Sequence, residues 1–241
     1  MYNLQGLIRR GINNTNVQFE RLAYISNNIG NLNTTAYKDV RFEQTLDENG
    51  YLDGAVRYDY KVGATMRTKR LLDVALTGPG FIPVTSPNGD VKYTRDGSFK
   101  IDAVGQVCTS DGFLIQPQIT IPQNATEINI TPDGNVSVKI GNDNNQSIVG
   151  QIQLVKFQNP SGLTSIGHNL YVETPASGTP VMGTPAQDGY GTIQQGFLEA
   201  SNVQLVDELI NLIKAERAFE ANSKIITASS DILQQTNAMV Q

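Results

Sequence analysis

The C-terminal end of the chain is the feature that most constrains the fold. No proline or glycine occurs between Phe197 and Gln241, and apolar residues recur there every seven positions, at Leu205, Leu212, Phe219, Ile226, Leu233 and Val240. This repeat is typical of helices that pack along one another. A helix of about forty residues would be about 60 Å long, far longer than one small domain needs. The spacing therefore predicts a long helix in a coiled coil or a bundle assembled from several chains.

The N-terminal end carries the same seven-residue spacing with weaker occupants. Residues 3–33 lack proline, and the apolar positions of the repeat are Leu4, Leu22, Ile25, Ile29 and Leu32. Small or polar residues stand between them, at Gly11, Thr15 and Gln18. We expect the two terminal helices to pair as a coiled-coil stem, and we call the eleven apolar positions of the two repeats the seam residues.

The middle of the chain has a different period. Val136, Val138 and Ile140 alternate with polar residues, and turn dipeptides such as Asn88-Gly89 and Asp133-Gly134 interrupt the sequence at short intervals. Short alternating runs between such turns predict antiparallel strands. The fold class is therefore α+β, with long helices at both ends and a central antiparallel all-β domain. The expected parts are a helix over 1–38, an extended connector over 39–71, a β domain over 72–199 and a helix over 200–241.

Composition excludes several classes of function. The net charge of −5 argues against nucleic-acid binding, which needs clustered Lys and Arg. A single cysteine, Cys108, rules out a disulfide within the chain. The start of the sequence lacks the apolar core of a cleavable secretory signal, and no run approaches the length of a membrane span.

A search for catalytic residues finds no supporting constellation. The single histidine, His168, has no nucleophile and acid at a suggestive spacing, and we expect it in a loop or strand. Cys108 follows an apolar residue and is interpreted as a buried thiol in a strand. No phosphate loop, zinc spacing or calcium loop is present. We therefore expect no enzyme, no cofactor, no metal and no small-molecule substrate.

Four stretches resemble the bacterial flagellar rod and hook family. They are SNNIGNLNTTAYK (26–38), LDVALTGPGFIPV (72–84), YTRDGSFKIDAVGQVCTSDGFLI (93–115) and EASNVQLVDELINLIKAERAFEANSKII (199–226). The family usually has Gly-Phe where Ala36-Tyr37 stand here. This difference affects the turn after the helix, because glycine tolerates a positive φ and alanine does not.

The resemblance implies a structural subunit of the flagellar rod that self-assembles into a helical tube and transmits torque from motor to hook. The runs NPSGLTSIGHNLYVET (159–174) and ERAFEANSK resemble distal rod subunits, whereas a short connector over 46–65 keeps the proximal rod as an alternative. The implied partners are further copies of the chain, other rod and hook proteins, bushing-ring proteins and the type III export apparatus. The implied location is the basal body in the cell envelope, reached without a cleavable signal peptide.

Two groups of residues are candidates for specific contacts in such an assembly. Asn28, Asn31 and Thr34 lie three apart, and they share one face of a helix that persists that far. Amide groups both donate and accept, so we expect polar contacts between subunits at these positions. The pattern FEQTL, with Phe42 and Leu46, resembles the recognition elements that the export gate reads in this family.

Two functions from other classes compete with the rod subunit. A secreted β-domain binding module with oligomerising helical ends would form a stable trimer through its C-terminal repeat, which light scattering would detect. A hydrolase would need His168 for its activity, and the sequence gives it no further support.

The weak seam leads to a prediction about the isolated chain. Ordering each residue costs about 1–2 kcal/mol, and a seam with Gly11, Thr15 and Gln18 at its middle buries little apolar area in return. We expect the terminal segments to be largely disordered in dilute monomer and to become helical on assembly. Circular dichroism of dilute monomer measures this directly, and helix over the full length of both ends would contradict it.

Overall fold

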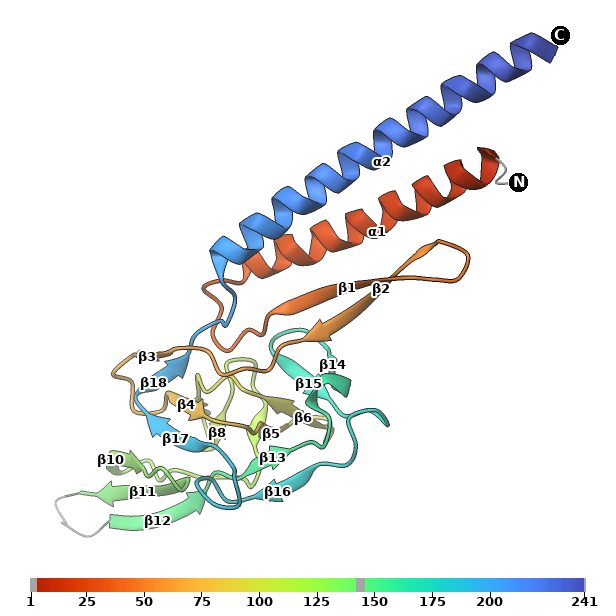
Figure 1. Ribbon diagram of the computed structural model, residues 1–241. Helices are drawn as coiled ribbons and strands as arrows, with labels where there is room; N and C mark the ends of the chain where they lie inside the picture. Colours follow the sequence, from red (N-terminus) through yellow and green to blue (C-terminus); the bar gives the residue numbers. More distant parts are fainter. Residues whose placement is uncertain (1–3, 142–145, 241) are drawn as a thin grey trace. The chain divides into compact units, whose positions relative to one another are not determined.

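The computed structural model describes residues 4–141 and 146–240, and the chain divides into two compact units (Figure 1). The first, here called the helical unit, comprises Met1–Leu32, Asp39–Asp59 and Val203–Gln241. The second, the β unit, comprises Asn33–Lys38 and Tyr60–Asn202. The chain therefore passes between the units four times, and the segment with the family signature contributes to both.

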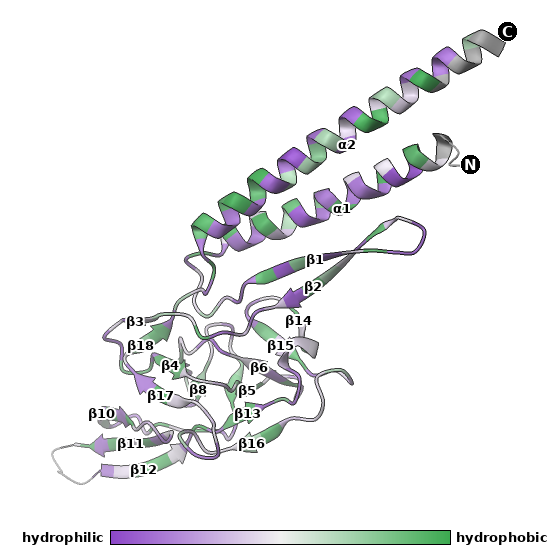
Figure 2. Cartoon of the chain, viewed as in Figure 1, coloured by the Kyte–Doolittle hydropathy of each residue, from purple (hydrophilic) through white to green (hydrophobic). Residues whose placement is uncertain are grey.

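The helical unit contains two long helices, α1 (Leu4–Gly30) and α2 (Leu205–Val240). They lie side by side and run in opposite directions (Figure 1). The expected helices at both ends are thus present, although α1 ends at Gly30, well before residue 38. Within the described residues, neither helix is long and apolar enough to cross a lipid bilayer. In Figure 2 α1 is mostly hydrophilic, whereas α2 carries apolar residues along its length.

Residues 39–71, interpreted above as an extended connector, contain three strands. Strands β1 (Val40–Leu46) and β2 (Leu52–Tyr58) form an antiparallel hairpin within the helical unit. The hairpin packs on α1, where the rings of Phe42 and Tyr24 stack at 5.5 Å. The alternation of apolar residues along β1 is broken by Gln44, and charged residues fill the opposite face. Because of this mixture, the hairpin has no regular period of apolar residues by which the sequence could reveal it.

The β unit consists of short antiparallel strands, as the alternating pattern predicts. The largest sheet has seven strands in the order β14-β15-β6-β5-β9-β8-β7, and smaller sheets pair β10-β11-β12, β13-β16, β17-β4 and β18-β3. The strands and a 3-10 helix of this unit are β3 (Thr65–Arg67), β4 (Val74–Thr77), β5 (Ile82–Thr85), β6 (Val91–Thr94), β7 (Lys100–Ile101), β8 (Val107–Cys108), β9 (Leu114–Ile115), β10 (Ala125–Ile130), β11 (Asn135–Ile140), β12 (Gln146–Gln151), β13 (Leu154–Lys156), η1 (Pro160–Gly162), β14 (Thr164–Ser165), β15 (Leu170–Val172), β16 (Val181–Gly183), β17 (Thr192–Gln195) and β18 (Phe197–Glu199).

An apolar core fills the β unit, with Leu76, Ile82 and Leu154 fully buried at its centre. A second cluster is aromatic, in which the rings of Tyr93 and Phe157 meet edge to face at 4.8 Å. The turn between β5 and β6 uses the expected Asn88-Gly89 pair, with Gly89 at a φ of +93°. The predicted β character of this part of the chain and its Asn88-Gly89 turn are therefore confirmed.

Ala36 adopts the backbone conformation that the family's usual glycine would favour. Its φ is +56°, a left-handed conformation that costs an L-residue about 1–2 kcal/mol. The surroundings hold it there, because its side chain is fully buried and its N–H donates to the carbonyl of Glu199 at 2.8 Å. The turn after α1 therefore contains a left-handed residue although no glycine stands there.

Candidate assembly interface

The contacts between α1 and α2 involve the middle of the predicted seam. The rings of Phe19 and Phe219 meet edge to face with centroids 5.0 Å apart. A Cβ atom at Gly11 would lie only 2.7 Å from Cγ1 of Ile226, so the glycine lets the two helices approach closely. Gly11 therefore has a packing role, although the spacing alone marked it as a weak position.

The seam residues differ in how far one chain covers them. Ile25 is buried, at 5% exposed, whereas Leu205 is 41% exposed. Most of the others are intermediate, namely Leu22, Ile29, Leu32, Leu212, Phe219 and Ile226. The side chains of Leu4, Leu233 and Val240 lie outside the described part of the chain. A strict seven-residue row drifts by about 20° per repeat around a straight helix, which carries Leu205 away from the row's buried members.

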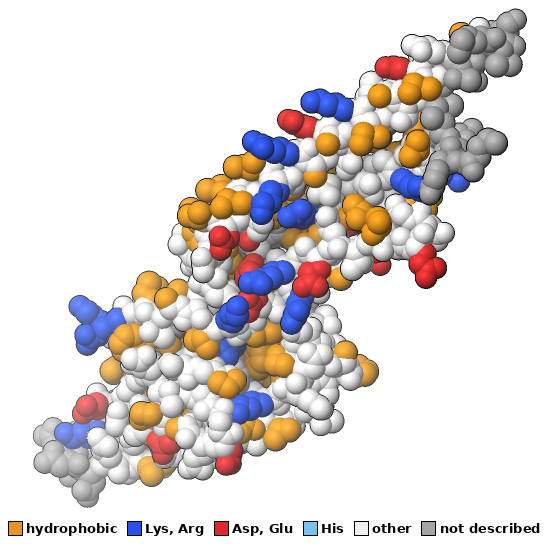
Figure 3. All heavy atoms as spheres, viewed as in Figure 1, with side chains coloured by type: hydrophobic (Ala, Val, Ile, Leu, Met, Phe, Trp, Pro, Cys, Tyr) orange, Lys and Arg blue, Asp and Glu red, His pale blue; other side chains and the backbone are white. Residues whose placement is uncertain are grey.

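The N-terminal third of α2 carries a second apolar face. Its members, here called the outer stripe, are each at least 41% exposed: Leu205, Val206, Leu209, Ile210 and Ile213. Val206, Ile210 and Ile213 lie on the side of the helix opposite the buried Ala215, with Leu209 beside them. Leu205 lies between that side and the more buried seam residues. Figure 3 shows hydrophobic side chains gathered over this part of α2. Farther along the same side, exposed charged residues such as Glu216 and Lys224 replace them.

Asn28 joins elements of its own chain. Its side chain is 1% exposed, and its Nδ2 donates to Asp39 Oδ1 at 2.8 Å and to the carbonyl of Val40 at 3.0 Å. Its Oδ1 accepts the N–H of Val40 at 3.1 Å. We expected this residue among the polar contacts between subunits, but the structure places it where it fixes the start of the hairpin against α1.

The other predicted polar and export residues are more accessible. Asn31 donates to the carbonyl of Asn27 at 2.8 Å, and both Asn31 and Thr34 are partly exposed. Phe42 is partly buried against Tyr24, whereas Leu46 is 67% exposed at the end of β1. The two positions of the FEQTL pattern therefore differ in their surroundings within the folded chain.

Two carboxyl groups of the helical unit are destabilised as charged groups. Burial raises the pKa of Asp39 and of Glu208, and the negative charges of Asp39 and Asp207 raise the pKa of Glu208 further. The side chain of Asn28 opposes this by hydrogen bonding to Glu208. A raised carboxyl pKa means that the folded state binds the proton more tightly. These groups therefore weaken the helical unit as the pH rises through their folded pKa values.

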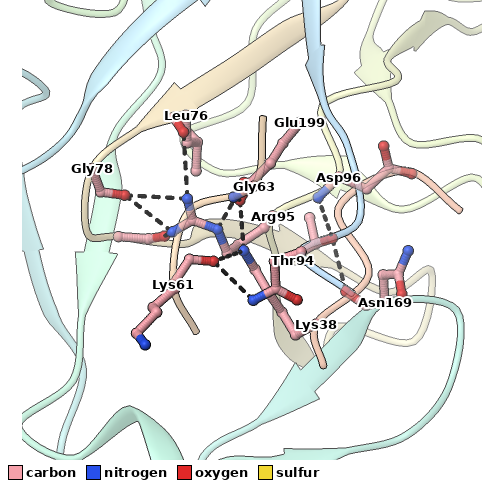
Figure 4. A network of polar contacts seen from close by, with 12 residues as sticks. Lys38, Lys61, Gly63, Leu76, Gly78, Thr94, Arg95, Asp96, Asn169 and Glu199 are labelled. Atoms are coloured by element: carbon pink, nitrogen blue, oxygen red, sulfur yellow. Dashed lines mark hydrogen bonds and ion pairs between the residues drawn. The ribbon is translucent and has the colours of Figure 1, made fainter. Parts of the chain in front are cut away.

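The β unit contains a buried network of charged residues that the sequence analysis missed (Figure 4). Lys38 Nζ lies 2.5 Å from Glu199 Oε1, and Arg95 Nε lies 2.9 Å from Glu199 Oε2. All three side chains are at most 2% exposed. The N–H of Gly63 also donates to Glu199 Oε1, at 2.8 Å. One carboxylate thus receives three donors from distant parts of the sequence.

Main-chain carbonyls satisfy the remaining donors of the two cations. Lys38 Nζ donates to the carbonyl of Lys61 at 2.7 Å. The guanidinium group of Arg95 donates to the carbonyls of Leu76, Gly78 and Gly80, the shortest at 2.7 Å. A buried cation that is both paired and hydrogen-bonded is tolerated, whereas an unpaired one is costly. A sequence signal existed in Glu199, an acid that directly follows the apolar pair Phe197-Leu198.

The residues considered for chemistry do not form a reactive site. His168 is 75% exposed in a turn between β14 and β15, with Nδ1 3.5 Å from Asp111 Oδ2. Cys108 lies buried in β8, as predicted, and burial raises the pKa of its thiol. In the described ranges, no group of three or more potential metal-ligating side chains comes together.

Comparison with known proteins identifies the family. The family described as "Flagellar hook protein FlgE/F/G D1 domain" matches residues 75–138, and "Flagellar basal body rod FlgEFG protein C-terminal" matches residues 194–239. The flagellar basal-body rod protein FlgG of Buchnera aphidicola subsp. Acyrthosiphon pisum is 41% identical over 239 residues, which cover 89% of this chain and 92% of that protein. The chain belongs to the flagellar basal-body rod protein FlgG family.

Two further relatives agree with this assignment. FlgG of Caulobacter vibrioides is 40% identical over 240 residues, with the same coverage of 89% and 92%. FlgF of the same organism is 34% identical over 228 residues, covering 88% of each chain. This rod protein is thus more similar to the FlgG relative than to the FlgF relative of one bacterium.

The ion network yields a prediction for the β unit of this rod protein. Glu199→Gln would leave Lys38 and Arg95 buried without a countercharge, and we expect a loss of about 3–5 kcal/mol in its free energy of unfolding. Glu127 is an exposed carboxylate on β10, so Glu127→Gln serves as the control and should cost less than about 0.5 kcal/mol. Chemical denaturation followed by tyrosine near-UV circular dichroism measures both, and equal stability of the two variants would contradict a stabilising role for the network.

Proposed function

We propose that the chain is a structural subunit of the distal rod of the bacterial flagellar basal body. Copies of it assemble into a helical tube that transmits torque from the motor to the hook. Membership of the FlgG family supports this role, and the greater similarity to FlgG than to FlgF makes a proximal rod subunit the less favoured reading. A binding module or a hydrolase has no comparable support.

The outer stripe of α2 is the observation that carries the proposal of assembly. A helix with apolar residues on two opposite sides is stable in water only when both sides are covered. In one chain, α1 covers the side of Ala215 and Phe219, and the outer stripe stays exposed. Burying the exposed part of its five side chains would contribute on the order of 5 kcal/mol per subunit. Helices of neighbouring copies supply a matching apolar cover.

We further propose that α1 and α2 form a coiled-coil stem in the assembled tube, with the seam residues at its centre. Gly11 against Ile226 and Phe19 against Phe219 give two contacts at which the helices already interlock. Few large apolar side chains are buried in the helical unit, and burial disfavours the charged forms of Asp39 and Glu208. Both observations support a stem that has little stability in a single chain. The assembly therefore supplies stability that the single chain lacks.

The family also suggests how the subunit reaches and contacts its surroundings. We propose export through the flagellar type III apparatus without a cleavable signal, with the pattern at Phe42 and Leu46 as one recognition element. In this proposal the assembled subunits lie in the basal body within the cell envelope. The β unit forms the outer layer of the rod and meets bushing-ring proteins, while other rod and hook proteins continue the tube at its ends.

A charge placed in the outer stripe tests the proposal. Ile213 is 51% exposed, so Ile213→Glu should leave the thermal stability of the monomer within about 1 kcal/mol of wild type. In the tube the same carboxylate would be buried unpaired, which costs several kcal/mol at every subunit. We expect swimming in soft agar to be lost in this variant. The matched control, Ile213→Leu, keeps the apolar surface and should swim normally; normal swimming of Ile213→Glu would refute burial of the stripe.

A further inference from the structure

Glu208 on α2 is a buried carboxyl group without a cation partner. It is 6% exposed, and its Oε2 is buried with no hydrogen-bond partner among the described residues. Two neutral amides, the side chains of Asn28 and Asn211, hydrogen-bond to the group. No ion pair reaches Glu208 from any residue that the structure describes. Glu199 of the β unit differs, because two buried cations pair with it. A buried carboxyl group without such a partner favours its neutral, protonated form.

A second carboxyl group meets the same amide from the start of the hairpin. Asp39 Oδ1 accepts a hydrogen bond from Asn28 Nδ2 at 2.8 Å, and the carbonyl of Val40 accepts another at 3.0 Å. A charged Glu208 only accepts, so it also needs a hydrogen of this nitrogen. An amide nitrogen carries two hydrogens and cannot serve three acceptors at once. Asn28 therefore links Asp39 and Glu208, here called the carboxyl pair, without satisfying both as charged groups.

The charges around the carboxyl pair add to the repulsion. Asp207 on α2 and Asp59, directly after β2, are further acids near the pair. The cation near Asp39 is Arg41 of β1, whose Nε lies 3.4 Å from Asp39 Oδ2. The side chain of Arg41 is 57% exposed and also pairs with Asp59 at 2.9 Å. Solvent therefore screens its effect on Asp39, and Glu208 gains no countercharge from it.

We propose that the carboxyl pair is a proton-binding site that holds one shared proton when α1, the hairpin and α2 pack together. Protonation removes one of two charges that repel each other and supplies the donor that the amide lacks. The pair joins all three elements of the helical unit, since Asn28 lies on α1, Asp39 precedes β1 and Glu208 lies on α2. The proposal goes beyond rod assembly, because it makes the order of the helical unit in each chain depend on pH.

The direction of this dependence follows from where the proton binds more tightly. In the unfolded chain both carboxyl groups are solvated and release their protons at ordinary pKa values, whereas burial raises the pKa of both in the folded helical unit. The helical unit is therefore most stable in acid and loses stability as the pH rises through the folded pKa values. A pKa that folding raises by one unit changes the folding equilibrium constant by up to about tenfold.

The helix content of the full-length monomer tests the site. Far-UV circular dichroism follows the helices in enough urea to remove half of the wild-type helix signal at neutral pH. We expect the ratio of helical to disordered wild-type chains to rise severalfold between about pH 8 and about pH 5. Glu208→Gln imitates the protonated group, so it should be more helical than wild type at the higher pH and respond less than half as much.

A matched control removes a carboxylate elsewhere on the same helix. Glu220 is exposed on α2, so Glu220→Gln should keep the full wild-type response. A wild-type helix signal that does not rise on acidification would overturn the proposal. A response of Glu208→Gln as large as that of wild type would overturn it as well.

Sharing of a single proton has its own signature. If Asp39 and Glu208 hold one proton between them, Asp39→Asn or Glu208→Gln alone should remove most of the response, and the double variant should remove little more. Two independent sites would instead each remove about half, and this additivity would contradict a shared proton. Near-UV circular dichroism of the tyrosines verifies that the β unit remains folded in every variant.

The proton site and the rod function fail in different ways. A monomer whose helix signal ignores pH refutes the proton site and leaves the proposed function standing. A chain that is absent from isolated rods refutes the proposed function, whereas the pH response of its monomer would still establish the proton site.

Discussion

The two apolar faces of α2 are the constraint on which the rest of this molecule depends. One face packs on α1 through Phe219 and Ala215, and the other face, the outer stripe, lies open to solvent. A monomeric helix needs one apolar stripe, so the second is an unfavourable exposure unless another chain covers it. The weak seam of α1 also favours assembly, because it limits the apolar area that a single chain buries when its terminal helices pair.

The buried ion network of the β unit, unlike the outer stripe, finds its partners within a single chain. Its buried carboxylate, Glu199, draws together Lys38 and the main chain around Lys61 and Gly63. Asn202 also donates to the carbonyl of Lys61, at 3.1 Å. These residues lie close in sequence to three of the four points at which the chain passes between the units. The network therefore holds together, within the β unit, the residues next to these three points.

Sequence reasoning succeeded where one period repeats and failed where contacts are set by distant residues. The long helices and the strand–turn pattern could be predicted because each residue type reports its own environment. The hairpin over residues 40–58 could not, because Gln44 and the charged face interrupt its alternation. The network around Glu199 was missed because its partners are far apart in the sequence. Asn28 was placed between subunits for its chemistry, yet its partner Val40 lies in the same chain.

Electron microscopy of basal bodies from a strain that lacks this gene tests the central claim most directly. The account predicts a rod that begins normally and stops short, without a hook, and full restoration by the wild-type chain. The helical ends would then be the part of the molecule that extends the shaft. Intact rods and hooks on swimming cells would contradict the account, because a strain that lacks its distal rod subunit could not build a complete rod.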